Sequence, residues 1–277
     1  MSFLAQVLFL LSFQVSTGDF VQVAGANIES RFDNAVRQGR NGSDETFWVG
    51  CQFPLEEGVR IDSRNGNFSV DRGTTIVRSS DDGIIWMLEN GDPTQRAGVF
   101  FLTRKSDGAI RRTRVLDLDQ NYEIRDRLVY WAGRAGADES VDLLARLVGE
   151  PRTRNTSSFM MLIGLHPTER ATDKLIEIAR GSLPNSVKKD ALFWLGQAVS
   201  QRAGEALRDV VMEETSEVAV QKQAVFAISR RDDESIPLLI EVAEDHPNLA
   251  VRKQAIFWLG RKEDPRIINF FERLLRN

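Results

Sequence analysis

The sequence contains few residues of the types that carry out catalysis or bind metal ions. Its two histidines, His166 in "LHPTE" and His246 in "DHPN", each precede a proline in a predicted loop. Two scattered histidines cannot build a multi-histidine metal centre, and no H-E-x-x-H, G-x-S-x-G or P-loop motif is present. We predict ordinary loop residues, with a pH-sensitive or metal-binding role as the alternative. The single cysteine, Cys51, is predicted to be a small hydrophobic residue on a strand.

A basic cluster lies on a predicted hairpin that turns at "KSDG", where a single acid, Asp107, accompanies the cations. The cations are Arg104, Lys105, Arg111, Arg112 and Arg114. Such a cluster is typical of a solvated hairpin face, or of a contact with an anion or an acidic partner. Over the whole chain 36 Lys and Arg stand against 40 Asp and Glu, a formal net charge of -4. No overall positive field attracts nucleic acid, and we predict no nucleic-acid partner.

The N-terminal segment, residues 1–18, has the pattern of a secretory signal. Its apolar run Phe3–Val15, "FLAQVLFLLSFQV", has 13 residues and no charge. A helix of this length at about 1.5 Å per residue cannot cross a hydrocarbon core of about 30 Å. Small residues follow in "STG" at 16–18, and "AGA" at 24–26 offers a later cleavage site. The pattern predicts export to the periplasm or the exterior without a stable membrane span; a buried N-terminal helix or an incorrect start is the alternative.

Residues 19–118 are predicted to form a β-rich domain. Short β-branched and aromatic runs such as "TFWVGCQF", "NFSV" and "AGVFFLT" alternate with turn motifs such as "RNGN", "DDG", "NGD" and "SDG". Another apolar run, "GIIWML", follows the same pattern. The weakly amphipathic stretch Ile28–Gln38 is predicted to be a helix.

Residues 119–277 show an internal repeat. The small residues that close successive apolar runs are separated by 31, 32, 33 and 31 positions: Gly133, Gly164, Gly196, Ser229 and Gly260. Each unit reads as a first helix, a polar turn and a second helix, so the pattern predicts five helical hairpins. Their approximate bounds are 122–153, 154–185, 186–218, 219–249 and 250–277.

Positions on the first helices predict how the hairpins pack. In the last repeat Val251, Ala255, Trp258 and Leu259 fall on one arc, the predicted core face, and the closing glycine is expected to permit the turn. The tryptophans Trp131, Trp194 and Trp258 alternate with Leu162 and Ala227, which predicts large-against-small packing. Three positions before each closing residue lies an apolar side chain, aromatic in Tyr130, Phe193, Phe226 and Phe257. These rings are predicted to pack between hairpins or to form a partly exposed stripe that binds a partner.

The segments "VRKQAIFWLG" and "EDPRIINFFERLL" resemble the short HEAT-like repeat class named after phycobilisome lyases. The resemblance implies an α-α solenoid, and with the β-rich half the chain is similar to exported bacterial HEAT-repeat proteins. The implied fold class is α+β and multidomain. Repeats of this class occur in chromophore lyases, hydroxylases and binding proteins. This chain lacks the His-Glu pairs of a di-iron hydroxylase, and we predict no cofactor.

The preferred functional hypothesis is a non-catalytic scaffold of the cell envelope that binds an unknown protein or peptide through its solenoid. The alternatives are a lyase- or hydrolase-type enzyme with a site at the junction of the two domains, and a structural component that assembles with itself. We also expect the N-terminal domain to cap the array. The C-terminal repeat edge is expected either to be sealed by its own charges or to contact another chain, as in a homo-oligomer.

Overall fold

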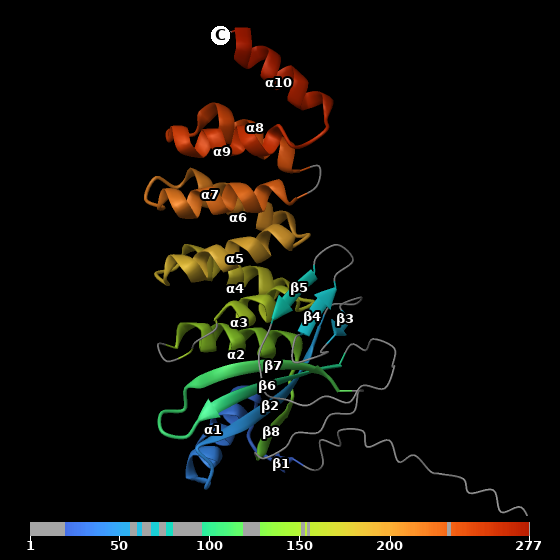
Figure 1. Cartoon of the computed structure of the whole chain (residues 1–277), viewed down its shortest axis with the longest axis vertical. Helices are drawn as coiled ribbons and strands as arrows, with labels where there is room; N and C mark the ends of the chain where they lie inside the picture. Colours follow the sequence, from blue (N-terminus) through green and yellow to red (C-terminus); the bar gives the residue numbers. More distant parts are fainter. Residues whose placement is uncertain are drawn as a thin grey trace, which may run out of the picture. The chain divides into compact units, whose positions relative to one another are not determined.

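A computed structural model describes residues 20–55, 60–62, 68–71, 76–79, 96–118, 128–150, 153, 156–231 and 234–276. The chain divides into two compact units, Met1–Gly136 and Ala137–Asn277 (Figure 1). We call them the N-terminal unit and the helical unit. The predicted signal segment, the "GIIWML" run and the "DDG" and "NGD" motifs lie outside the described residues. Strands in the first unit and helices in the second confirm the α+β class.

The main sheet of the N-terminal unit has the strand order β1-β8-β2-β6-β7. These strands are β1 Val21–Gln22, β8 Val129–Arg134, β2 Thr46–Pro54, β6 Arg96–Arg104 and β7 Ile110–Asp117. Strands β2, β6 and β7 pair antiparallel, whereas β8 runs parallel to both β1 and β2. A second antiparallel sheet consists of β3 Arg60–Asp62, β4 Phe68–Asp71 and β5 Ile76–Ser79. Strands are thus present at the predicted β-rich runs that fall in the described residues.

Helix α1, Ile28–Asn41, covers one face of the main sheet and confirms the predicted N-terminal helix. Asn27 begins it with a capping box, in which its side chain accepts from the Ser30 backbone and the Ser30 hydroxyl accepts from the Asn27 backbone. Phe32 packs edge-on against Phe101 of β6, with ring centroids 5.4 Å apart. Gly39 lies so close to the Phe47 ring that a Cβ there would stand 2.2 Å from it. The helix therefore sits directly on the strands.

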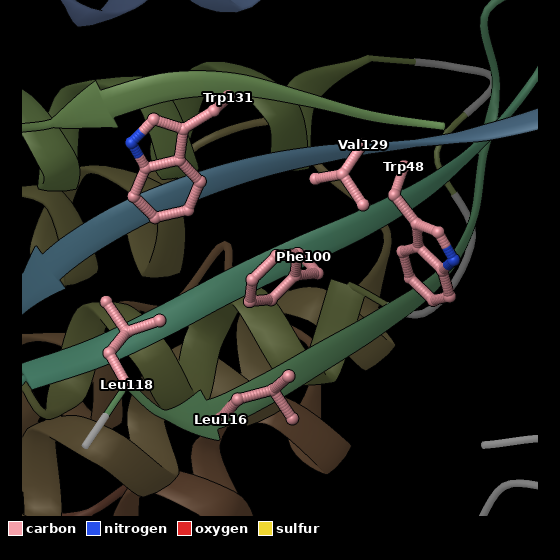
Figure 2. Packing of buried hydrophobic residues seen from close by; sticks show 6 residues of the cluster. All are labelled: Trp48, Phe100, Leu116, Leu118, Val129 and Trp131. Carbon is pink, nitrogen blue, oxygen red and sulfur yellow. The ribbon is translucent and has the colours of Figure 1, made fainter. Parts of the chain in front are cut away.

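The opposite face of the main sheet carries an apolar cluster (Figure 2). Its members come from four strands and the end of β7: Trp48, Phe100, Leu116, Leu118, Val129 and Trp131. Gly50 and Gly98 lie beneath these side chains, since a Cβ at Gly50 would stand 2.7 Å from the Trp131 ring and one at Gly98 2.5 Å from Leu118. Burying each large side chain contributes about 1.5–3 kcal/mol, so both faces of the sheet hold the unit together.

The predicted first helix of repeat one is wrong where the structure describes it. Residues Val129–Arg134 form strand β8, between β1 and β2. A strand that is paired on both edges and buried on both faces has a continuous run of apolar residues in its sequence. The run "VYWAG" is therefore compatible with such a strand and also with a buried helix. Gly133 has a φ of 84° and lies where the pairing of β8 with Gly50 and Cys51 is irregular. Because Gly133 belongs to a strand and does not close a helix, its distance from Gly164 in the sequence is not a repeat spacing. The strand belongs to the N-terminal unit, which extends to 136 instead of 118.

The helical unit is a series of helices in two rows (Figure 1). The odd row contains α3 Thr156–Gly164, α5 Asn185–Gln197, α7 Val218–Ser229 and α9 Leu249–Leu259. The even row contains α2 Ala137–Gly149, α4 Glu169–Arg180, α6 Gln201–Met212, α8 Ser235–Asp245 and α10 Pro265–Arg276. Each helix from α3 to α8 contacts its neighbours in the chain and the next helix of its own row. This arrangement is repeat-like, with periods close to those predicted from the sequence.

Glycines in the odd row allow close helix packing and not the turn that we predicted. A Cβ at Gly164 would lie 2.6 Å from the Trp194 ring, and one at Gly196 would lie 2.7 Å from the Ala227 carbonyl oxygen. Among the described glycines positive φ occurs at Gly108 and Gly133, so Gly164, Gly196 and Gly260 have ordinary helical or extended backbone. The absence of a side chain therefore lets the Trp194 ring lie on Gly164 and the Ala227 backbone lie on Gly196. The predicted alternation of tryptophans with Leu162 and Ala227 stays a prediction.

The predicted core face of the first helices is largely buried. Val251, Ala255 and Leu259 of α9 are fully buried. Trp258 is only half-buried, and its ring lies 5.3 Å from Phe226 and 5.1 Å from Phe257. Its counterpart Trp194, which packs over Gly164, is 5% exposed. The two tryptophans therefore differ although they share a position in the repeat.

Candidate interaction sites

The residues with chemically versatile side chains are buried and serve the fold. His166 and His246 are 2% and 1% exposed. Nδ1 of His166 lies 2.6 Å from the Leu162 carbonyl oxygen, and Nε2 of His246 lies 2.9 Å from that of Val211. Burial lowers the pKa of His166 from 6.5 to about 4, so its ring is neutral at pH 7. Both histidines lie in turns, as predicted.

Cys51 is fully buried in β2, as predicted, and burial raises the pKa of its thiol. A buried neutral thiol is a poor nucleophile. The described residues contain no group of three or more His, Cys, Asp or Glu side chains placed to hold a metal ion.

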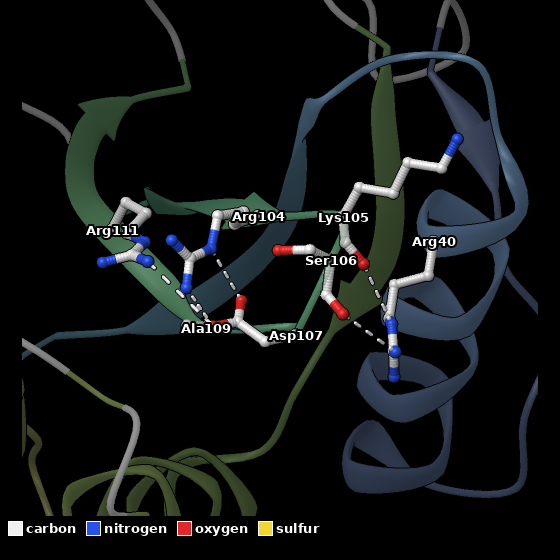
Figure 3. Close-up of polar contacts among 7 residues, drawn as sticks. All are labelled: Arg40, Arg104, Lys105, Ser106, Asp107, Ala109 and Arg111. Carbon is white, nitrogen blue, oxygen red and sulfur yellow. Dashed lines mark hydrogen bonds and ion pairs between the residues drawn. The ribbon is translucent and has the colours of Figure 1, made fainter.

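The basic hairpin between β6 and β7 turns at "KSDG", with Gly108 at a φ of 71° (Figure 3). Arg104 makes two hydrogen bonds to the Asp107 carboxylate, one of them 2.9 Å long, and an Arg111 guanidinium nitrogen lies 4.0 Å from it. The hydrogen bond from Arg104 lowers the pKa of Asp107, which also accepts from the Ala109 backbone. Asp107 therefore organises the turn and offsets part of the predicted positive charge.

The remaining cations of the hairpin point to different places. Lys105 Nζ donates to the Gly42 carbonyl oxygen at 2.6 Å, whereas Arg114 is 3% exposed and Arg112 is half-buried. Arg40 of α1 donates to the carbonyl oxygens of Lys105 and Ser106 (Figure 3). It also lines an open hollow of about 710 Å³ beside the turn. The five predicted cations do not form one continuous basic surface.

Tyr130 does not belong to the predicted aromatic stripe. It lies on β8 in the N-terminal unit, is 6% exposed and packs edge-on against Phe47 at 5.6 Å. The other three predicted rings do share a position: Phe193, Phe226 and Phe257 are the ninth residues of α5, α7 and α9. Phe193 and Phe226 are half-buried, and Phe257 is 52% exposed. The helical unit therefore keeps a stripe of three partly exposed rings.

A lysine accompanies each of these rings, which our sequence analysis missed. Lys189, Lys222 and Lys253 are the fifth residues of the same helices, four positions before the rings. Residues four apart lie on one face of a helix, so each lysine is next to a phenylalanine. We call the six residues the Lys–Phe stripe: Lys189, Phe193, Lys222, Phe226, Lys253 and Phe257. The recurring K-x-x-x-F spacing was the available signal.

The even row carries a different pattern, in which an arginine of one helix pairs with a carboxylate of an adjacent helix of the same row. We call these pairs the Arg–carboxylate ladder: Asp142–Arg170 (2.8 Å), Asp173–Arg202 (2.7 Å), Arg180–Asp209 (2.6 Å), Arg208–Glu241, and Glu244–Arg273 (2.9 Å). Hydrogen bonding to Glu241 raises the pKa of Arg208. The charges of this row are thus largely paired within it.

A buried arginine joins successive repeats below the surface. Arg231, in the turn between α7 and α8, is 6% exposed. Its guanidinium donates to the carbonyl oxygens of Ala198 at 2.6 Å and Ser200 at 3.0 Å, beyond the end of α5, and to the Glu234 carboxylate at 2.8 Å. It occupies the repeat position of His166, two residues after the closing residue. Both side chains satisfy carbonyl groups near the end of a first helix.

The last helix of the array is strongly amphipathic. Ile267 and Phe270 of α10 are buried, whereas Ile268, Leu274 and Leu275 are exposed. Beside α8, this helix borders an open hollow of about 460 Å³ lined by residues that include Glu244 and Arg273. Self-association through this edge stays a prediction.

Comparison with known proteins identifies no relative from which the function of the helical unit could be inferred. No protein-family model matches this sequence, and no curated protein is significantly similar to it. Within the described residues, no helix is both long enough and apolar enough to cross a membrane. The function is therefore inferred from the two rows of helices and the surfaces that they present.

Proposed function

We propose that this chain is a non-catalytic interaction module, in which a HEAT-like solenoid binds a protein or peptide through its surface. The observation that carries the proposal is the Lys–Phe stripe, which puts a cation and a partly exposed ring at equivalent positions of three successive odd-row helices. Repeated helices that each add one contact to an extended surface are typical of binding solenoids. Aromatic side chains are enriched in the core of protein–protein interfaces relative to the rest of the surface.

The apolar, uncharged run at residues 3–15 supports an exported location for this module. A partner would then belong to the cell envelope or the exterior. Sequence patterning alone carries this part of the proposal.

The proposal can be tested by lysine-directed cross-linking of the full chain in native extract, followed by mass spectrometry. We expect peptides of another protein attached to Lys189, Lys222 or Lys253. Lys174 of the even row, which pairs with Glu177 at 2.7 Å, provides the internal comparison and should give few such products. Absence of inter-protein cross-links to the helical unit would contradict the proposed function.

A further inference from the structure

We propose that the Lys–Phe stripe binds an acidic peptide segment that also carries apolar side chains. This inference rests on the proposed function and adds the chemistry of the partner. The stripe runs over α5, α7 and α9, and α7 contacts both of the others, so the three Lys–Phe pairs lie on neighbouring helices. The surface is therefore continuous from one repeat to the next.

The charge of the odd row favours an acidic ligand. Helices α7 and α9 contain no Asp or Glu, and α5 contains only Asp190, which accepts a hydrogen bond from Ser157 at 2.5 Å. Within the described residues, none of the three stripe lysines forms an ion pair, in contrast to the arginines of the ladder. Arg230 and Arg261, exposed at the ends of α7 and α9, add positive charge. A chain with a net charge of -4 thus keeps one row available to carboxylates.

The apolar part of the surface sets a second requirement on the ligand. Phe257 is 52% exposed, and the first residues of α7 and α9, Val218 and Leu249, are 37% and 54% exposed. These side chains lie one and two helical turns from the lysines and rings on the same face, because the first, fifth and ninth residues are four apart. A purely charged ligand would leave this apolar area in water, whereas a segment with both acidic and apolar residues would cover it.

The geometry of the rings favours a peptide over a nucleic acid. Base binding requires an open ring face on which the base stacks. The Arg261 guanidinium carbon already lies 5.5 Å from the centroid of the Phe257 ring, and Phe226 lies against Trp258 at 5.3 Å. Each helix contributes one lysine to the stripe, and packed helices are about 8–10 Å apart, whereas a nucleic-acid strand carries one phosphate about every 3.4 Å.

The same helix spacing indicates the period of the ligand. A chain in the polyproline II conformation rises about 3.1 Å per residue with three residues per turn, so every third side chain returns to the same face after about the distance between neighbouring helices. An acidic and an apolar residue in each set of three would therefore meet one Lys–Phe pair per helix. A Glu-Leu-Ser repeat has this composition.

The test is titration of the full-length chain into a fluorescently labelled synthetic peptide of five Glu-Leu-Ser repeats, read by anisotropy. We expect saturable binding that weakens at least about tenfold in the triple variant Lys189→Glu, Lys222→Glu, Lys253→Glu, because attraction becomes repulsion at three sites. The three lysines are exposed or half-buried, and glutamate has about the same helix propensity as lysine, so the helices should be retained. Circular dichroism should show unchanged helix content.

A charge-matched variant of the even row, Lys174→Glu, Arg202→Glu, Arg276→Glu, should bind almost as well as the parent chain. If peptide binding were weakened equally in the two triple variants, the net charge of the protein and not the Lys–Phe stripe would determine binding, and the assignment to the stripe would be wrong. Equal or tighter binding of a Lys-Leu-Ser peptide or of a single-stranded oligothymidylate of the same length would overturn the acidic-peptide assignment. If the Glu-Leu-Ser peptide fails to bind while cross-linking recovers a partner on the helical unit, this inference is wrong and the proposed function stands.

Discussion

The helices of the two rows of the helical unit are stacked through different kinds of contact. The odd row packs through apolar and small residues, as where Trp194 lies over Gly164 and Gly196 lies against Ala227. The even row adds polar connections at its surface, the Arg–carboxylate ladder. Close packing already fixes the odd row, so its lysines are not needed for stacking. The charge pairs of the even row stabilise its stacking, whereas the three stripe lysines of the odd row, which form no ion pair with a described residue, can bind a partner.

The largest expected effect separates two tryptophans of the odd row. Trp194→Ala removes a ring that is 5% exposed, and we expect a loss of about 3–5 kcal/mol in the free energy of unfolding. Trp258→Ala removes a half-buried ring and should cost less than half as much. Urea unfolding followed by far-UV circular dichroism measures both. Equal losses would show that the position in the repeat, and not the local packing, sets the energy.

The turn from the odd row to the even row should make the helical unit sensitive to acid. Burial lowers the pKa of His166 from 6.5 to about 4, so the unfolded chain takes up the proton first as the pH falls. The stabilisation is therefore complete above pH 6.5 and is lost between about pH 6.5 and 4, by about 3 kcal/mol in total. Urea unfolding across this range should show a flatter pH dependence for His166→Gln than for the parent chain. Carboxylates titrate in both proteins, so identical slopes would contradict the role of His166.

Two glycines test whether close packing is confined to the odd row. Gly196→Ala puts a methyl group 2.7 Å from the Ala227 carbonyl oxygen, and we expect a loss of about 1–3 kcal/mol as α5 and α7 move apart. Gly149→Ala, at the end of α2 in the even row, meets no atom within 4 Å and should be neutral or stabilising by up to about 1 kcal/mol. Thermal unfolding of the two variants provides the comparison. A destabilising Gly149→Ala would remove the distinction between the rows.

The smallest effect concerns the charges themselves. Arg208→Gln removes one ladder pair and should cost less than about 1 kcal/mol, because both partners are partly exposed. The loss should nearly vanish in about 1 M salt, where the Debye length is about 3 Å. Lys222→Gln should have no comparable effect at either salt concentration. If the two substitutions prove equally costly in dilute buffer, Lys222 has a structural partner and the stripe is not available for binding.

Sequence patterning was sufficient for the elements whose stability is local. The 3.6-residue periodicity and the spacing of Gly164, Gly196, Ser229 and Gly260 predicted first helices that end at or next to these residues. The strand runs and "KSDG" were likewise predicted, because alternation and turn chemistry are properties of neighbouring residues.

Features that depend on distant partners could not be predicted in this way. The run "VYWAG" is compatible with a helix or a buried strand, and only pairing with β1 and β2 decides between them. The ladder was missed because its partners are 28 to 33 residues apart in the sequence. Which arginine meets which carboxylate is determined only by the stacking of the even-row helices. Tyr130 was assigned to the wrong surface because it lies in the run "VYWAG", which was predicted to be a helix and forms β8. The lysines of the stripe were visible in the sequence, but the fact that they form no ion pair with any described residue was not.

The place of β8 in the main sheet has a consequence for the order in which the chain can acquire its structure. Strand β1 pairs through β8 with β2, so residues 21–22 and 46–54 stay unjoined until the ribosome has produced residue 134. Contacts in the helical unit are mostly between neighbouring segments, so its helices can be added one after another. A fragment that stops at residue 118 would lack the strand that joins β1 to the sheet, and would expose Trp48 and Phe100 to aggregation. Expression of the N-terminal unit by itself should therefore extend to residue 136.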